Sequence, residues 1–193
     1  MHEPGNIRLH IGLIHDPVYD KNQQKIVSAI TNLDLHDLSR VSKTYGIRQF
    51  FVINPLEDQI KLANRIVKHW TTGYGASYNH DRRLAMELVE IAPSLVEATD
   101  RIKKREGKVP LLIATDAGDQ GQKTISYARA RELLSSGQTI FLLFGTAWGL
   151  EREVFKRVDY ILEPIKGIRE YNHLSVRTAA AIIIDRLLDR IYG

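Results

Sequence analysis

Short apolar runs alternate along the chain with longer segments in which apolar residues recur at helical spacing. The runs are rich in leucine, β-branched and aromatic residues, and they predict strands buried on both faces. They cover 9–14, 48–54, 110–116, 139–145 and, as a weaker run, 159–165. The amphipathic segments predict helices, which cover 32–45, 57–70, 95–106, 125–136, 150–157 and 174–191.

This alternation of strand and helix is typical of an α/β fold with a mostly parallel sheet and helices on both faces. Ligands of such folds bind beyond the carboxyl ends of the strands. We therefore expect a site at the loops that follow Asp116, Gly145 and Ile165. The segment 71–83 contains two glycines and two arginines, and it predicts either a mobile substrate loop or a surface connection.

The last predicted helix is apolar on every side, because three alanines and three isoleucines follow one another at 179–184. Such a helix is expected to be buried all round. In a protein of this size that predicts insertion into the body of the fold, a homodimer formed through this helix, or both together.

Composition limits the possible classes of protein. The chain has 193 residues and 44% apolar content, so we expect one domain, 1–193. It has no cysteine, which excludes disulfides and thiolate metal sites, and its histidines show no spacing of metal ligands. No segment approaches the roughly 20 apolar residues that span a membrane, and the N-terminus does not resemble a leader. A cytoplasmic protein without a metal is therefore expected, and the net charge of +4 fits an anionic partner such as RNA.

Three segments place glycines or clustered polar residues beside predicted strand or helix ends. In 142–153 a buried strand runs into a turn with Gly145 and Gly149, although any strand-to-helix turn of an α/β protein can carry glycine. In 162–188 a dense polar cluster precedes the apolar helix and exceeds what a helix cap requires, which indicates a binding loop. In 31–55 Asp34, Asp37 and Arg40 are spaced as neighbours on one helix, where a surface ion-pair cluster is the ordinary explanation.

Together these segments resemble, in order, the three motifs of the SPOUT methyltransferases, and the resemblance extends over nearly the whole chain. Arg40 and Gly46 stand where the first motif has its arginine and glycine, and Asp34 stands where asparagine is usual. Residues 171–173 replace the usual Ser-Leu-Asn of the third motif. The runs HDPVYDK, TNLDLHDLSR, LFGTAWGL and YNHLSVR resemble a bacterial SPOUT family that is sometimes fused to tRNA (guanine-N1)-methyltransferase.

The resemblance implies a C-terminal deep trefoil knot, the SPOUT α/β knot, and a homodimer formed through the knot and the last helix. It implies S-adenosylmethionine as cofactor and RNA, either tRNA or rRNA, as substrate. The residues expected to bind the cofactor are Thr115, Phe144, Gly145, Thr146, Gly149, Leu162, Glu163, Pro164, Ile165, Asn172, His173, Leu174 and Ser175. Most of these contacts are expected to come from backbone groups.

The catalytic residues depend on the acceptor atom. If the acceptor is a ribose 2′-hydroxyl, Arg40 is expected to orient a phosphate and stabilise the developing alkoxide. If it is a base nitrogen, Asp34, His36, Asp37 or His173 is expected to manage the proton. For RNA binding, Arg82 and Arg83 are candidates for phosphate contacts and Tyr74 and Tyr78 for base stacking. Further candidates for phosphate contacts are Lys103, Lys104, Arg105, Lys166 and Arg169.

Two other hypotheses stay open from the sequence. A non-catalytic module that binds cofactor and RNA in ribosome assembly or regulation is suggested by Asp34 and by the altered third motif. An ordinary doubly wound nucleotide-binding protein without a knot also fits the alternation of helix and strand.

Overall fold

The structure is a computed structural model and describes residues 7–118, 123–169 and 171–192. Within these residues one sheet has seven strands, in the order β5-β4-β1-β8-β6-β9-β7, and every neighbouring pair is parallel. The strands are β1 (Leu9–Ile14), β4 (Gln49–Ile53), β5 (Val89–Ala92), β6 (Leu111–Ala114), β7 (Thr124–Ile125), β8 (Ile140–Gly145) and β9 (Tyr160–Leu162).

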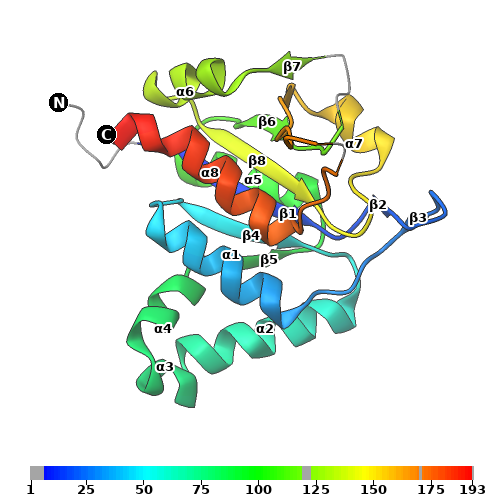
Figure 1. Ribbon diagram of the computed structural model, residues 1–193. Coiled ribbons are helices and arrows are strands. Elements are labelled where there is room, and N and C mark those ends of the chain that lie inside the picture. The colour runs from blue at the N-terminus through cyan, green and yellow to red at the C-terminus, as the bar shows by residue number, and fades with distance from the viewer. Residues whose placement is uncertain (1–6, 119–122, 170, 193) are drawn as a thin grey trace.

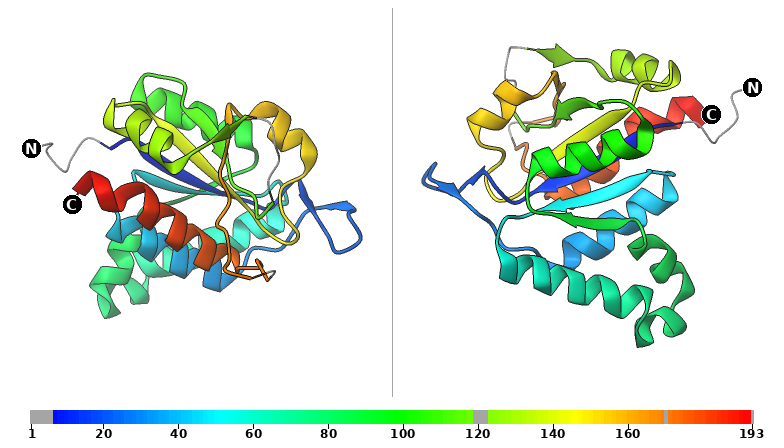
Figure 2. Two further views of the ribbon diagram at one scale, coloured as in Figure 1. Left: turned by 45° about the horizontal axis from the view of Figure 1, so that its top comes forward. Right: turned by 180° about the vertical axis from the view of Figure 1, so that it is seen from behind.

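Helices cover both faces of this sheet (Figure 1). They are α1 (Asn32–Thr44), α2 (Glu57–Thr71), α3 (Tyr74–Tyr78), α4 (His80–Met86), α5 (Leu95–Glu106), α6 (Tyr127–Ser135), α7 (Arg152–Arg157) and α8 (Val176–Tyr192). Helices α1, α2, α6 and α8 bury apolar residues in the core on one face, and α5 and α7 do so on the other. The view from behind in Figure 2 shows α5 lying across the second face.

The strands supply both cores because successive side chains point to opposite faces of a sheet. In the central strand β8, Leu142 and Phe144 pack in the core under α8, whereas Phe141 and Leu143 pack in the core under α5. Each of these four side chains is at most 1% exposed. A strand that is buried on both faces needs apolar side chains on both, so polar and apolar residues do not alternate along it. This explains the continuous apolar runs in the sequence.

A small antiparallel hairpin lies outside the main sheet and supports the turn that follows β8. It pairs β2 (Val18–Tyr19) with β3 (Lys25–Ile26). The Tyr19 amide donates to the Gly149 carbonyl at 3.0 Å, and the Trp148 amide donates to the Tyr19 carbonyl at 3.0 Å. The hairpin therefore fixes the backbone on one side of the 145–150 turn.

The predicted α/β architecture with a mostly parallel sheet is confirmed, and each predicted strand and helix has a counterpart within a few residues. Two predictions were wrong. The segment 71–83 forms the end of α2, α3 and most of α4 instead of a loop. Helix α8 is not buried all round, because Asp185, Arg186 and Asp189 are exposed while Ala180 and Ile184 are fully buried.

Among the described residues, no helix is long and apolar enough to cross a membrane. In the same residues no group of three or more histidine and acidic side chains is arranged to hold a metal ion.

Candidate functional site

A pocket of about 860 Å³ lies beyond the carboxyl ends of β6 and β8, where the sequence predicted a site. This volume is in the range of sites for small molecules and cofactors. The loop before α1, the ends of β6 and β8, and the segment leading into α8 together form its walls. The lining residues are Ser28, Ala29, Thr31, Asp34, Thr115, Asp116, Ala117, Phe144, Gly145, Thr146, Ala147, Trp148, Gly149, Ile165, Asn172, His173, Leu174, Ser175, Val176, Arg177, Ala179 and Ile183.

The turn after β8 brings its backbone to the surface of the pocket. A Cβ on Gly145 would lie 2.8 Å from the Leu150 nitrogen, so only glycine fits there without moving the backbone. Ala147 and Gly149 have φ of 52° and 101°, and the Gly149 amide donates to the Thr146 carbonyl at 3.0 Å. The turn is therefore tightly wound, and it offers backbone amides and carbonyls as binding groups.

A chain of hydrogen bonds connects this turn to the loop before α1. The Thr146 hydroxyl donates to the Ile14 carbonyl at 3.0 Å, so it accepts from Ser28 Oγ, which lies 2.5 Å away. Ser28 Oγ in turn accepts from His15 Nδ1 at 2.9 Å. Burial lowers the pKa of His15 to about 4, so the ring is neutral at pH 7 and carries its proton on Nδ1.

Asn172 holds together two loops that line the pocket. Its Nδ2 donates to the Ile165 carbonyl at 2.9 Å and to the Ala117 carbonyl at 3.2 Å. Thr115 Oγ1 donates to the Leu143 carbonyl at 2.9 Å, which ties the end of β6 to β8. These two side chains thus position the backbone that lines the pocket.

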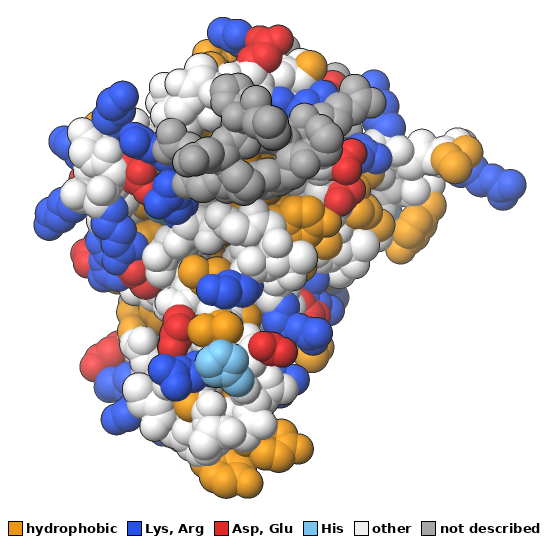
Figure 3. All heavy atoms as spheres, turned by 90° about the vertical axis from the view of Figure 1, so that its left-hand side faces the viewer, with side chains coloured by type: hydrophobic (Ala, Val, Ile, Leu, Met, Phe, Trp, Pro, Cys, Tyr) orange, Lys and Arg blue, Asp and Glu red, His pale blue; other side chains and the backbone are white. Residues whose placement is uncertain are grey.

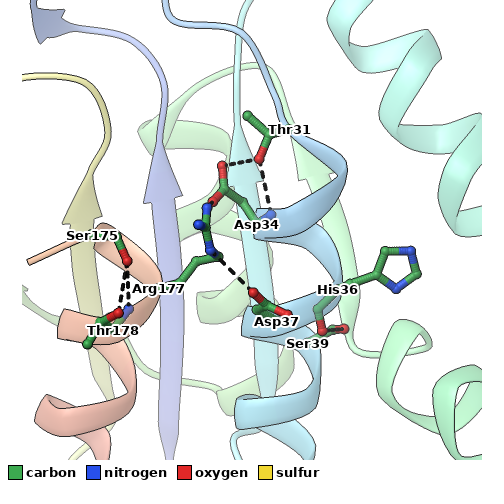
Figure 4. Close-up of polar contacts among 8 residues, drawn as sticks. All are labelled: Thr31, Asp34, His36, Asp37, Ser39, Ser175, Arg177 and Thr178. Atoms are coloured by element: carbon green, nitrogen blue, oxygen red, sulfur yellow. Dashed lines mark hydrogen bonds and ion pairs between the residues drawn. The ribbon is translucent and has the colours of Figure 1, made fainter.

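An ion-pair cluster joins α1 to α8 at the edge of the pocket (Figure 4). Arg177 Nη1 lies 2.8 Å from Asp34 Oδ1, and Arg177 Nε lies 3.2 Å from Asp37 Oδ2. Asp34 is 4% exposed and also accepts from the Thr31 hydroxyl at 2.6 Å. His36 points away from Arg177 on the other side of α1. One arginine is therefore shared by two carboxylates, Asp34 and Asp37.

Most of the residues predicted to bind the cofactor line this pocket, and three do not. Leu162 is buried in the core, Glu163 Oε1 accepts from the Tyr127 amide at 2.7 Å at the start of α6, and Pro164 lies beside them without lining the pocket. Of the residues predicted to be catalytic, Asp34 and His173 line the pocket. His36, Asp37 and the exposed Arg40 do not.

Several other lining residues were not predicted from the sequence. Ser28 and Ala29 come from a loop without a motif, and Thr31 begins the first motif segment but was not singled out. Hydrogen bonds connect Ser28 to Thr146 and Thr31 to Asp34. Trp148 is 63% exposed although it lines the pocket. Its position beside the predicted glycines was the signal that could have identified it.

Known structures share this fold. One is the SpoU methyltransferase AviRb from Streptomyces viridochromogenes in complex with the cofactor AdoMet, with a TM-score of 0.59 and 16% sequence identity. The match covers 95% of this chain and 58% of that one. The chain therefore shares its arrangement of sheet and helices with this solved structure.

The family follows from the sequence comparisons. A family described as SAM-dependent RNA methyltransferase matches residues 8–189, and the chain belongs to this family. This membership confirms the predicted class of enzyme and its cofactor, S-adenosylmethionine.

Two relatives show how far the likeness extends. A tRNA (guanine-N(1)-)-methyltransferase of Oleidesulfovibrio alaskensis is 43% identical over 185 residues, which are 96% of this chain and 43% of the relative. An uncharacterized protein of Aquifex aeolicus is 37% identical over 186 residues, which are 96% of this chain and 90% of the relative. The chain thus spans less than half of the named tRNA methyltransferase, and that name describes the whole relative.

Proposed function

We propose that the pocket beyond β6 and β8 binds S-adenosylmethionine and that the protein is a cytoplasmic enzyme that methylates tRNA or rRNA. The observation that carries this proposal is the pocket itself. Its volume of about 860 Å³ suits a nucleoside joined to an amino acid, and it lies at the glycine turn of the second motif and the loop of the third.

The lining fits the cofactor chemically. Ile165, Leu174 and Ile183 offer apolar surface for an adenine ring, and the backbone of 145–149 offers fixed donors and acceptors for its edge. Asp34 and Asp116 bring carboxylates to a pocket that would hold a sulfonium cation, and Asp34 is already balanced by Arg177. Asn172 contributes by keeping the loops at 117 and 165 together.

The bound cofactor supplies a methyl group activated by its sulfonium. The protein's own task is then to align the acceptor and to manage one proton, and alignment alone can contribute roughly 7–11 kcal/mol. Among the titratable residues that line the pocket in the described part of the chain, Asp34 and Arg177 pair with each other. Asp116 and His173 are therefore the groups that we propose for proton transfer if the acceptor is a base nitrogen.

Arg40 lies outside the pocket of its own chain and is exposed. A role in orienting phosphate at the reacting nucleotide therefore requires that it reach the pocket of a second copy, or that the RNA extend from the pocket to α1. We propose the first arrangement, a homodimer through the C-terminal helix and a trefoil knot formed by the segments around the pocket. The half-buried Ala181 and Ile182 of α8 support such a contact.

A non-catalytic module is the second candidate function. It is favoured by one observation: Arg177 forms ion pairs with both Asp34 and Asp37, two of the residues predicted to be catalytic. Such a module would use the same pocket to bind the cofactor without transferring its methyl group.

Transfer of a tritiated methyl group from S-adenosylmethionine tests the proposal. The acceptor is bulk tRNA and ribosomal RNA from a strain that lacks the gene, and the enzyme is compared with Arg40→Ala and with Arg129→Ala, a matched exposed arginine on α6. We expect label in RNA with the wild type and with Arg129→Ala, and a large loss with Arg40→Ala. Cofactor binding without transfer would favour the non-catalytic module, and absence of cofactor binding would refute both candidates.

A further inference from the structure

The end of the molecule formed by α2, α3 and α4 presents two large aromatic side chains to solvent. Tyr74 and Tyr78 lie one turn apart on α3 and are 75% and 73% exposed. Their rings are stacked, with centroids 6.1 Å apart and planes inclined by 25°. Figure 3 faces the left-hand side of Figure 1, and hydrophobic side chains protrude at its lower edge, at the height where α3 lies in Figure 1. Contiguous exposed apolar surface of this kind marks sites of interaction.

Two glycines hold α3 in this position. A Cβ on Gly75 would lie 2.6 Å from Trp70 Cε3, and one on Gly73 would lie 2.8 Å from the His69 carbonyl oxygen. Helix α3 therefore packs directly on the end of α2, although Gly75 within it is a weaker helix former than alanine. The close packing fixes the backbone of α3 and leaves both tyrosines on the outside, so their exposure is a feature of an ordered segment.

A cluster of cationic and aromatic groups supports α3 from behind. The Arg82 guanidinium of α4 lies 4.5 Å from the centroid of Trp70, a cation–π arrangement. The edges of His36 and His69 meet the same ring at centroid distances of 5.3 and 5.0 Å. Burial lowers the pKa of His36, with Arg82 and Arg40 acting in the same direction, so His36 is neutral and the positive charge here belongs to the arginines.

The charges around the tyrosines are mixed but favour an anion. Lys68 lies in the last turn of α2, which contacts α3, and Arg82 forms no ion pair with any described carboxylate. Arg83 is paired with Glu87 at 2.9 Å, and Asp81 is the exposed carboxylate on the first turn of α4. Lys68 and Arg82 are thus cations that remain available for phosphate groups next to an exposed aromatic pair.

We propose that Tyr74 and Tyr78 form a stacking platform for unpaired bases of the RNA substrate, with Lys68 and Arg82 contacting the adjacent phosphates. This inference rests on the proposed RNA methylation and places a second RNA contact away from the pocket. Aromatic faces accept any base, so stacking strengthens binding without depending on the RNA sequence. The platform therefore holds a single-stranded loop or end of the RNA without reading its sequence.

Binding of RNA to variants of the platform tests this inference. We compare the wild type with Tyr74→Ala/Tyr78→Ala, Tyr74→Phe/Tyr78→Phe and Val96→Ala, the last removing an exposed apolar side chain of α5 on the other face of the sheet. The probes are bulk tRNA and a short single-stranded RNA of mixed sequence, followed by fluorescence anisotropy. We expect the double alanine variant to bind both probes at least roughly tenfold more weakly, and the phenylalanine and Val96→Ala variants to bind like the wild type.

The same variants separate failure of the platform from failure of the proposed function. We expect the double alanine variant to keep the melting temperature and the cofactor affinity of the wild type, because both tyrosines are exposed and lie outside the pocket. Unchanged RNA binding by this variant would overturn the platform, whatever the methylation assay shows. Loss of self-association with intact RNA binding would also overturn it and assign the tyrosines to a contact between two copies of the chain.

Discussion

The ion pair between Asp34 and Arg177 is expected to be a main contact between α1 and α8, and a double-mutant cycle measures its strength. Asp34 and Arg177 are replaced by alanine singly and together, and unfolding in urea gives the free energy of each variant. Breaking a fully buried pair costs roughly 3–5 kcal/mol. The Asp34 side chain is 6% exposed but that of Arg177 is 31% exposed, and Arg177 keeps Asp37 as a partner. We therefore expect a coupling energy of about 1–2 kcal/mol.

Asp37 provides the matched control, because it contacts the same arginine with a side chain that is 50% exposed. The cycle between Asp37 and Arg177 is expected to give about 0.5 kcal/mol or less. The variant Asp34→Asn separates charge from hydrogen bonding, since an amide oxygen can still accept from Thr31. We expect it to be more stable than Asp34→Ala. Equal coupling energies in the two cycles would refute the reasoning, because burial of Asp34 would then not strengthen its ion pair with Arg177.

Two further predictions concern the turn after β8 and the buried histidine behind it. Gly145→Ala places a Cβ 2.8 Å from the Leu150 nitrogen, so we expect calorimetry to show at least roughly tenfold weaker binding of S-adenosylmethionine. The control is Gly107→Ala, at a glycine with φ of 70° that lies outside the pocket lining. We expect this variant to lower the melting temperature without changing cofactor binding. The pKa of His15 is lowered from 6.5 to about 4 by burial, so between these pH values the unfolded chain binds a proton that the native protein does not. The free energy of unfolding should therefore fall on acidification through this range, by up to about 1.4 kcal/mol per pH unit. A smaller dependence of the unfolding free energy on pH in His15→Gln would confirm that His15 causes the effect.

The central strands were predictable because they are buried on both faces. β1 matches its predicted range, 9–14, and β8 differs by one residue at its start. β5 (Val89–Ala92) was missed because it is short and Glu90, at its centre, forms ion pairs with arginines of α5. β7 has only two residues and depends on pairing with β9, a long-range contact that leaves no local pattern.

The segment 71–83 shows why a local signal can mislead. Glycines and polar residues ordinarily indicate a loop. Here Gly73 and Gly75 allow α3 to approach Trp70 and His69 more closely than any side chain would permit. The glycines therefore serve helix packing, and only the position of α2 reveals this.

The pocket was predictable from one topological rule, whereas its polar contacts were not. Parallel strands place the loops after β6 and β8 at one edge, so the residues following Thr115 and Gly145 had to meet. The pairing of Asp34 with Arg177 joins residues 143 positions apart, and the Ser28–Thr146 hydrogen bond joins residues 118 positions apart. Such contacts depend on the packing of α1 against α8, which a single sequence does not reveal.

A crystal structure of the protein with S-adenosylmethionine tests the central claim most directly. The account predicts cofactor density in the pocket between the 145–149 turn and residues 172–175, with backbone groups of the turn within hydrogen-bond distance of the ligand. Cofactor density elsewhere on the protein, or an empty pocket at saturating cofactor, would contradict it.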